Sequence, residues 1–157
     1  MDLEAVIQRP IEALLPHAAP MVLLDRCLSI SPERFEAEVT LAAESPFCVG
    51  HRVGAWVGIE YMAQAVAAFA GAEAIAAGLP VKVGFLLGSR HYESRVPYFY
   101  VGSHLRVAVK KVLAEENGLG ALDCQIYIDG SLEAQVQATL TVFQVEDLGS
   151  FLKKSVA

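Results

Sequence analysis

The chain has 157 residues with a net charge of −6, 54% hydrophobic residues and a mean hydropathy of +0.42. This length predicts a single domain spanning residues 1–157 with a core of its own. The acidic balance, without a run of Lys or Arg, excludes nucleic acid and anionic membrane surfaces as the main partner. Because the composition is more apolar than that of a typical soluble domain, we expect a large face to be covered in an oligomer.

The first third of the chain predicts a short helical turn followed by a hairpin. Residues 11–15 lie between two prolines and suit one helical turn. Residues 21–30 are mostly apolar and predict a strand, and residues 35–41 alternate apolar and polar side chains, as a half-exposed strand does. Residues 42–53, which contain His51, are expected to form a loop.

A long apolar helix is predicted for residues 54–77, with Gly78 and Pro80 as its stop signals. Nearly all its sides are apolar, which is typical of a helix enclosed by other structure. Polar residues interrupt it too often for a membrane span. Glu60 stands nearly two turns inside, where a carboxylate is costly unless it is paired or protonated, so it is the first candidate for chemistry.

The second half of the chain predicts strands joined by tight turns. Asn-Gly and Asp-Gly pairs between apolar runs are strong hairpin signals. The whole order is a hairpin, one long helix and an antiparallel meander, which predicts an α+β fold in which one sheet wraps one helix. The expected strands are residues 81–87, 91–96, 104–114, 119–129 and 132–145, and residues 150–157 add a short helix or a frayed end.

The cysteines and the first residues bear on location and cofactors. The three cysteines, Cys27, Cys48 and Cys124, are odd in number and lack the spacing of metal ligands, which predicts a reducing, cytoplasmic setting and no bound metal. Acidic residues stand where a signal peptide needs basic ones, so no export signal is expected. Without a Gly-rich phosphate loop, we expect no nucleotide cofactor.

His51 and Glu60 form the candidate catalytic pair, because a neutral imidazole and a desolvated carboxyl can act as base and acid near pH 7. Nine positions separate them. This spacing does not force contact within one chain, so either a substrate lies between them or His51 of one subunit faces Glu60 of another. A buried ion pair without catalytic function has the same pattern.

The expected helix start supplies candidate substrate-binding groups. Free N–H groups around Gly54, Ala55 and Trp56 would stabilise a polarised carbonyl oxygen. A glycine there would also let a substrate approach the backbone. Gln64 follows Glu60 by four positions and shares its helix face, so it is predicted to hydrogen-bond the carboxylate or its loop.

Two separated motifs carry a resemblance that covers most of residues 11–112. Residues 11–26, with Leu-Pro-His, a proline, an apolar run and Asp-Arg, resemble the opening of bacterial 3-hydroxyacyl-acyl carrier protein dehydratases. Residues 50–51, Gly-His, and residues 59–64, Ile-Glu-Tyr-Met-Ala-Gln, resemble the catalytic loop and central helix of that family. Residues 57–66 look most like a divergent branch associated with aryl polyene pigment clusters, in which some members are expected to serve as one partner of a heterodimer.

The resemblance implies a hotdog fold, an antiparallel sheet curled around a long helix, and a dimer whose sites contain residues of both subunits. It implies that His51 acts at C2 of the acyl chain and that Glu60 of the other subunit assists loss of the 3-hydroxyl as water. It further implies that the amide of Gly54 or a neighbour holds the thioester carbonyl, and that Gln64 corresponds to the helix glutamine of the family. No cofactor is implied.

The leading hypothesis is a hydro-lyase that converts a 3-hydroxyacyl thioester to a trans-2-enoyl thioester, in fatty-acid or polyketide synthesis. Its partners would be acyl carrier protein or another acyl thioester, and a second copy of the chain or a related dehydratase. Two alternatives remain open. One is a hotdog thioesterase, because these enzymes also carry an acid on the central helix; the other is a non-catalytic acyl-binding subunit, because the loop after His51 is shorter than that of the family.

Overall fold

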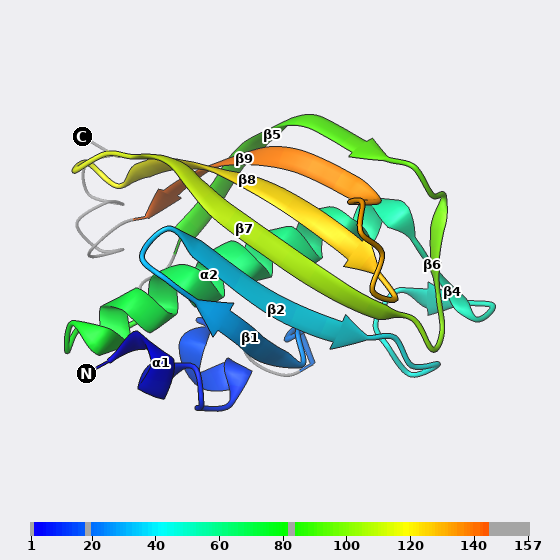
Figure 1. Ribbon diagram of the computed structural model, residues 1–157, viewed down its shortest axis with the longest axis horizontal. Helices are drawn as coiled ribbons and strands as arrows, with labels where there is room; N and C mark the ends of the chain where they lie inside the picture. Colours follow the sequence, from blue (N-terminus) through cyan, green and yellow to red (C-terminus); the bar gives the residue numbers. More distant parts are fainter. Residues whose placement is uncertain (1, 18–19, 82–83, 145–157) are drawn as a thin grey trace, which may run out of the picture.

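The computed structural model describes residues 2–17, 20–81 and 84–144, in which strands surround one long helix (Figure 1). The helical elements are α1 (Leu3–Val6), the 3-10 turns η1 (Ile11–Leu14) and η2 (Ala55–Val57), and α2 (Gly58–Ala76). The strands are β1 (Arg26–Ile30), β2 (Arg34–Thr40), β3 (Cys48–Val49), β4 (Arg52–Gly54), β5 (Gly84–Ser94), β6 (Tyr98–Tyr100), β7 (His104–Ala114), β8 (Leu119–Ile128) and β9 (Val136–Gln144).

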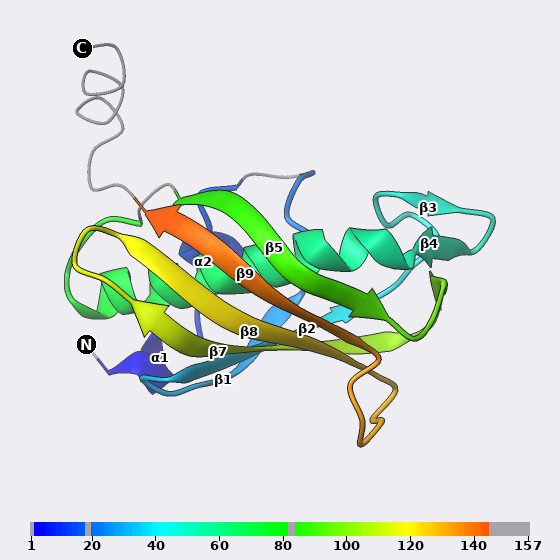
Figure 2. The same ribbon diagram turned by 90° about the horizontal axis from the view of Figure 1, so that it is seen from above.

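Six strands form one antiparallel sheet in the order β1-β2-β7-β8-β9-β5. The sheet curls along α2 and covers one side of the helix, as the two perpendicular views show (Figures 1 and 2). The predicted α+β layout of one sheet around one helix is therefore confirmed. The predicted hairpin of the first third is the β1–β2 pair.

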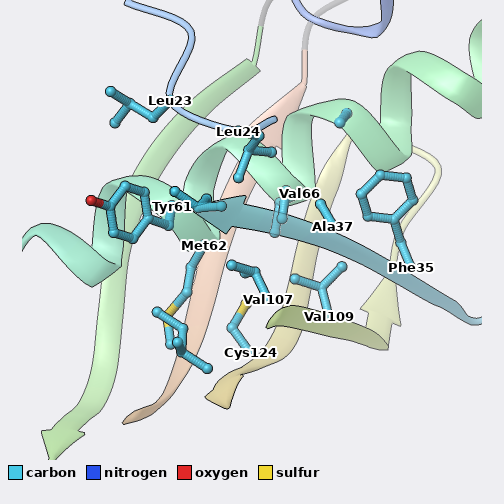
Figure 3. Close-up of a cluster of buried hydrophobic side chains, with 14 of the residues drawn as sticks. Leu23, Leu24, Phe35, Ala37, Tyr61, Met62, Val66, Val107, Val109 and Cys124 are labelled. Atoms are coloured by element: carbon cyan, nitrogen blue, oxygen red, sulfur yellow. The ribbon is translucent and has the colours of Figure 1, made fainter. Parts of the chain in front are cut away.

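The core lies between this sheet and α2. In β2 and in the first half of β7, up to Val109, every second side chain points inward and is buried, as the period of a strand requires. Phe35 of β2 stacks on Phe69 of α2, with ring centroids 5.6 Å apart. Figure 3 shows Val107, Val109 and Met62 in the same apolar layer. The helix is enclosed on its sheet side, as its apolar sequence predicts.

A second, three-stranded sheet, β3-β4-β6, lies beside the start of α2 (Figure 2). The prediction of a loop over residues 42–53 is wrong here, because β3 and β4 form a hairpin in it. Strands of two and three residues are too short to show a period-two pattern, which explains why the sequence did not reveal them.

Several predicted boundaries differ from the observed ones. The strand predicted for residues 21–30 begins only at Arg26. The two strands predicted for residues 81–87 and 91–96 are one strand, β5, with register shifts between Leu86 and Gly88 and again after Arg90. Gly88 thus lies at a bulge and does not end the strand.

Two further differences concern the chain ends. The last strand starts at Val136, later than the expected residue 132. The helix expected over residues 150–157, like residue 145, lies outside the described residues. The short helix α1 was not predicted.

The start of α2 differs from its prediction in a way that matters for the site. The chain passes through the 3-10 turn η2 first, so α2 begins at Gly58 instead of Gly54. Glu60 is consequently a residue of the first turn, not one nearly two turns inside. Among the described residues, no helix combines the length and apolar character needed to cross a membrane.

Candidate active site

His51 occupies the two-residue turn of the β3–β4 hairpin. Gly50 and His51 have φ angles of 61° and 64°, the left-handed pair that a tight hairpin turn with the twist of its strands requires. The carbonyl oxygen of His51 accepts a hydrogen bond of 3.0 Å from the Val101 N–H, which ties the turn to the chain after β6. The side chain is exposed, and the hairpin extends past the start of α2 in both views (Figures 1 and 2).

Glu60 is exposed in the protomer, so the predicted desolvated carboxyl is not found there. The cause is its place in the first turn of α2, on a side that the sheet leaves uncovered. Within the described residues, neither Glu60 nor His51 has a side-chain hydrogen bond or ion pair, and the two do not contact each other in one protomer. The structure thus brings both to the same end of α2 without joining them.

A groove with a volume of about 400 Å³ runs along α2 from Glu60. Ala63, Ala67 and Ala70 line its helix side, and Glu73 lies at its far end. The two carboxylates are thirteen positions apart on the helix, which is about 20 Å at 1.5 Å per residue. The strands opposite contribute mainly apolar side chains, so the groove suits a long apolar ligand with a reactive group at the Glu60 end.

The backbone N–H groups of Gly54 and Ala55 differ in their relation to β6. The Ala55 N–H donates to the Pro97 carbonyl at 3.0 Å, so the prediction that it is free is wrong. Gly54 pairs with Tyr98 in the β4–β6 ladder, one position away from that bond. Since hydrogen-bonded and non-bonded pairs alternate in an antiparallel ladder, the Gly54 N–H points away from β6.

Trp56 is not a core residue, although an aromatic next to a buried helix suggests one. Its side chain is 65% exposed and lies directly over Gly54: a Cβ atom added to Gly54 would stand only 2.4 Å from the indole Nε1. The ring of Phe47 meets the indole edge-on, with centroids 6.0 Å apart. Gly54 is therefore needed here for the close approach of the indole.

Gln64 is buried and fully engaged with another part of the chain. Its Nε2 donates to the Met21 carbonyl at 2.6 Å, and its Oε1 accepts from the Leu23 N–H at 2.8 Å. The Gln64 amide thus satisfies backbone groups of the segment before β1 that a neighbouring strand would otherwise satisfy. This explains why β1 starts at Arg26 and not at the predicted residue 21. The predicted bond to Glu60 is not found, and substrate contact by Gln64 stays a prediction.

Tyr92, which the sequence did not single out, positions the turn before α2. Its hydroxyl donates a hydrogen bond to the Ala55 carbonyl. Burial raises the pKa of Tyr92 to about 12, and burial is also the main cause that raises the pKa of the neighbouring core residue Tyr61 to about 12. Both phenols stay protonated near neutral pH, so Tyr92 acts here as a hydrogen-bond donor.

The described part of the chain contains no group of three or more His, Cys, Asp or Glu side chains placed to hold a metal ion. The candidate groups near the start of α2 are the Glu60 carboxyl group, the His51 imidazole and the Gly54 N–H. A sheet wrapped around one helix that carries such a carboxylate defines the class: hotdog-fold proteins, whose solved examples include dehydratases and thioesterases.

Comparison with known proteins gives the family. The family model described as ApeP dehydratase, of the ApeP-like group, matches residues 9–153, and the chain belongs to this family. The chain is similar to the 3-hydroxyacyl-[acyl-carrier-protein] dehydratase FabZ of Oleidesulfovibrio alaskensis, with 29% identity over 146 residues, 89% of this chain and 93% of the relative.

Solved structures agree. A chain of the dehydratase heterocomplex ApeI:P from Xenorhabdus doucetiae has 29% identity and a TM-score of 0.85, with 92% of this chain and 96% of that chain covered. A hypothetical thioesterase from Streptococcus pneumoniae, solved with coenzyme A, has 11% identity and a TM-score of 0.59, with 76% and 84% covered. The second likeness shows the fold alone. The hotdog fold and the dehydratase family expected from the motifs are confirmed.

Proposed function

We propose that this protein dehydrates a 3-hydroxyacyl thioester, carried on acyl carrier protein, to the trans-2-enoyl thioester. The observation that carries the proposal is the Glu60 carboxyl group at the head of the apolar groove, without an ion-pair partner among residues 2–17, 20–81 and 84–144, in a chain of a dehydratase family. His51 takes the proton from C2, and the carboxyl group of Glu60 delivers a proton to the 3-hydroxyl as the C3–O bond breaks. The C2–H electron pair becomes the double bond, water leaves, and proton exchange restores both side chains.

The groove supports an acyl substrate. With the thioester near Glu60, the acyl chain runs along the alanines of α2 and loses apolar surface to water contact. In this proposal the Gly54 N–H, which is left out of the β4–β6 ladder, holds the thioester carbonyl. Substrate binding and chemistry are then both served by the start of α2.

A second subunit would complete the site. Strand β5 pairs with β9 on one side only and lies at the edge of the six-stranded sheet. Leu86 and Leu87 of this edge are 41% and 59% exposed, a composition that favours pairing with another strand. We propose that a second copy of the chain, or a related dehydratase, pairs along β5 and that His51 of one subunit serves Glu60 of the other.

The test is turnover of a 3-hydroxyacyl carrier protein by the purified protein, following enoyl product and free thiol together. Enoyl product without thiol release is expected. Glu60→Gln and His51→Asn should each lower the rate by at least about 100-fold, the usual contribution of a general acid or base. Asparagine tolerates the left-handed conformation of residue 51, so the hairpin should persist.

Matched controls separate the chemistry from the fold. Glu44→Gln removes an exposed carboxylate elsewhere, and His104→Asn removes an exposed imidazole at the start of β7, away from the β5 edge. Both controls should keep wild-type turnover. Unchanged turnover in Glu60→Gln would contradict the assigned role of this residue, and thiol release without enoyl product would indicate a thioesterase instead.

A non-catalytic role in a heterodimer is the second candidate. It is favoured by the similarity to a dehydratase heterocomplex and by the absence of a His51–Glu60 contact in the protomer, within the described residues. It predicts that the purified protein alone is inactive and that activity returns when a related dehydratase chain is added. Activity of the protein alone excludes it.

A further inference from the structure

Trp56 places a side-chain donor beside the backbone donor at Gly54. The indole Nε1 lies within 2.4 Å of the position that a Cβ on Gly54 would take, so this ring nitrogen and not another edge of the ring faces Gly54. An indole N–H is a donor only, and no acceptor for it is found among the described residues. Two N–H groups, one backbone and one side chain, therefore stand next to each other.

The aromatic neighbour fixes this geometry. Phe47 meets the Trp56 ring edge-on at 6.0 Å, although its own backbone has a φ of 69°, a conformation that is rare for a bulky residue. Holding an exposed ring in place at the cost of backbone strain is typical of a functional site. The Trp56 ring is thereby restrained over Gly54 while 65% of its surface stays open to a ligand.

Trp56 also lies on the approach to Glu60. Trp56 lies in η2, which leads directly into α2, and Glu60 follows four positions later in the first turn of α2. A thioester with its reacting carbons at Glu60 therefore has its carbonyl near Gly54 and the indole. Removal of the C2 proton develops negative charge on this oxygen, which donors in place stabilise without reorganisation.

We propose that the Trp56 Nε1–H is a second hydrogen-bond donor to the thioester carbonyl oxygen, acting together with the Gly54 N–H. This inference rests on the proposed function, since it names the part of the site that holds the acyl thioester. It assigns the indole to the substrate, in place of a role in packing alone.

Because the chain has a single tryptophan, its indole can be observed and replaced selectively. The first measurement follows the indole ¹⁵N–¹H resonance while a pantetheine 3-hydroxyacyl analogue is added, in which CH₂ replaces the thioester sulfur and the carbonyl is kept. A downfield proton shift is expected. A control analogue with CH₂ also in place of the carbonyl should bind without this shift; equal shifts with both analogues, or none with either when bound, overturn the proposal.

The second measurement is turnover after replacing Trp56 by β-(3-benzothienyl)alanine, which keeps the ring shape and exchanges N–H for sulfur. We expect kcat to fall on the order of 10- to 100-fold, as for loss of a donor to a developing charge, with KM little changed. Unchanged kcat overturns the proposal. If the wild-type protein shows no turnover, the proposed function fails instead, and the indole shift still decides whether Trp56 binds the carbonyl.

Discussion

The two sheets of this molecule differ in role: the six-stranded sheet stabilises the fold, and the three-stranded sheet carries candidate site residues. The six-stranded sheet has strands of up to 11 residues and buries its inner side chains against α2. The three-stranded sheet has strands of two or three residues and exposes the large side chains of Val49 and Tyr100. Yet the small sheet carries His51 and Gly54. The large sheet therefore supplies most of the buried core, and the small one presents two of the candidate site residues.

Positive φ angles at non-glycine residues occur beside both sheets. Phe47 and His51 lie beside or within the small sheet, whereas His91 lies in β5 and Asp129 directly follows β8. Such conformations cost on the order of 1 kcal/mol or more each and persist only where the surrounding structure enforces them. The core of the large sheet offsets this cost.

The largest expected effect comes from the same substitution made in each region. Phe35→Ala removes a fully buried ring that stacks on Phe69, and it should lower the free energy of unfolding by about 3–5 kcal/mol. Phe47→Ala removes a ring that is 44% exposed and should cost below about 1 kcal/mol. Urea denaturation of both variants measures the difference; similar losses would contradict the division between the sheets.

A smaller effect is expected where η1 packs on α2. A Cβ at Gly71 would lie 1.9 Å from the Leu14 carbonyl oxygen, a backbone atom that cannot move alone. Gly71→Ala should therefore lower stability by about 1–3 kcal/mol, despite the better helix propensity of alanine. Gly88→Ala is the control, because the space around Gly88 is open. A stabilised Gly71→Ala variant would show that η1 does not pack there.

High pH should weaken the core below the small sheet. Burial is the largest cause that raises the pKa of Tyr61 from 10.0 to about 12, so the unfolded chain loses this proton at lower pH than the folded one. Its stabilising contribution is present below pH 10 and is lost as the pH rises towards 12. Urea midpoints measured from pH 9 to 11 should fall, and Tyr61→Phe should fall less steeply. Parallel slopes would exclude Tyr61 as a cause.

The smallest effect is expected for the ion pair at the far end of the groove. Lys111 Nζ lies 2.7 Å from Glu73 Oε2, and the two side chains are 27% and 37% exposed. Partly solvated pairs contribute about 0–1 kcal/mol, so Lys111→Met should leave thermal stability nearly unchanged. A loss as large as that of Phe35→Ala would mean that this pair belongs to the core.

Sequence patterns predicted the large sheet and the helix well. The alternation in β2 and the apolar length of α2 are regular signals, and β7 has its predicted bounds of residues 104–114. The motifs identified the dehydratase family, and the role of Glu60 stays a prediction. What the patterns missed depends on short or distant contacts: the β4–β6 pairing, the hydroxyl of Tyr92 at Ala55, and the use of Gln64 by the segment before β1. The exposure of Glu60 was missed because a helix that is apolar all round does not reveal which side its own sheet leaves open.

The hydrogen bond from Tyr92 to Ala55 has a thermodynamic consequence. Tyr92 belongs to β5, the strand at the sheet edge, whereas Ala55 follows Gly54 in the turn before α2. Linked equilibria are reciprocal: a chain that binds β5 more tightly when this hydrogen bond is formed strengthens the bond by the same free energy. If a second chain pairs along β5, a higher protomer concentration favours this pairing. Through the linkage it would also favour the hydrogen bond from Tyr92 to Ala55 and so order the turn before α2. Protomer concentration would then act as an effector of the site.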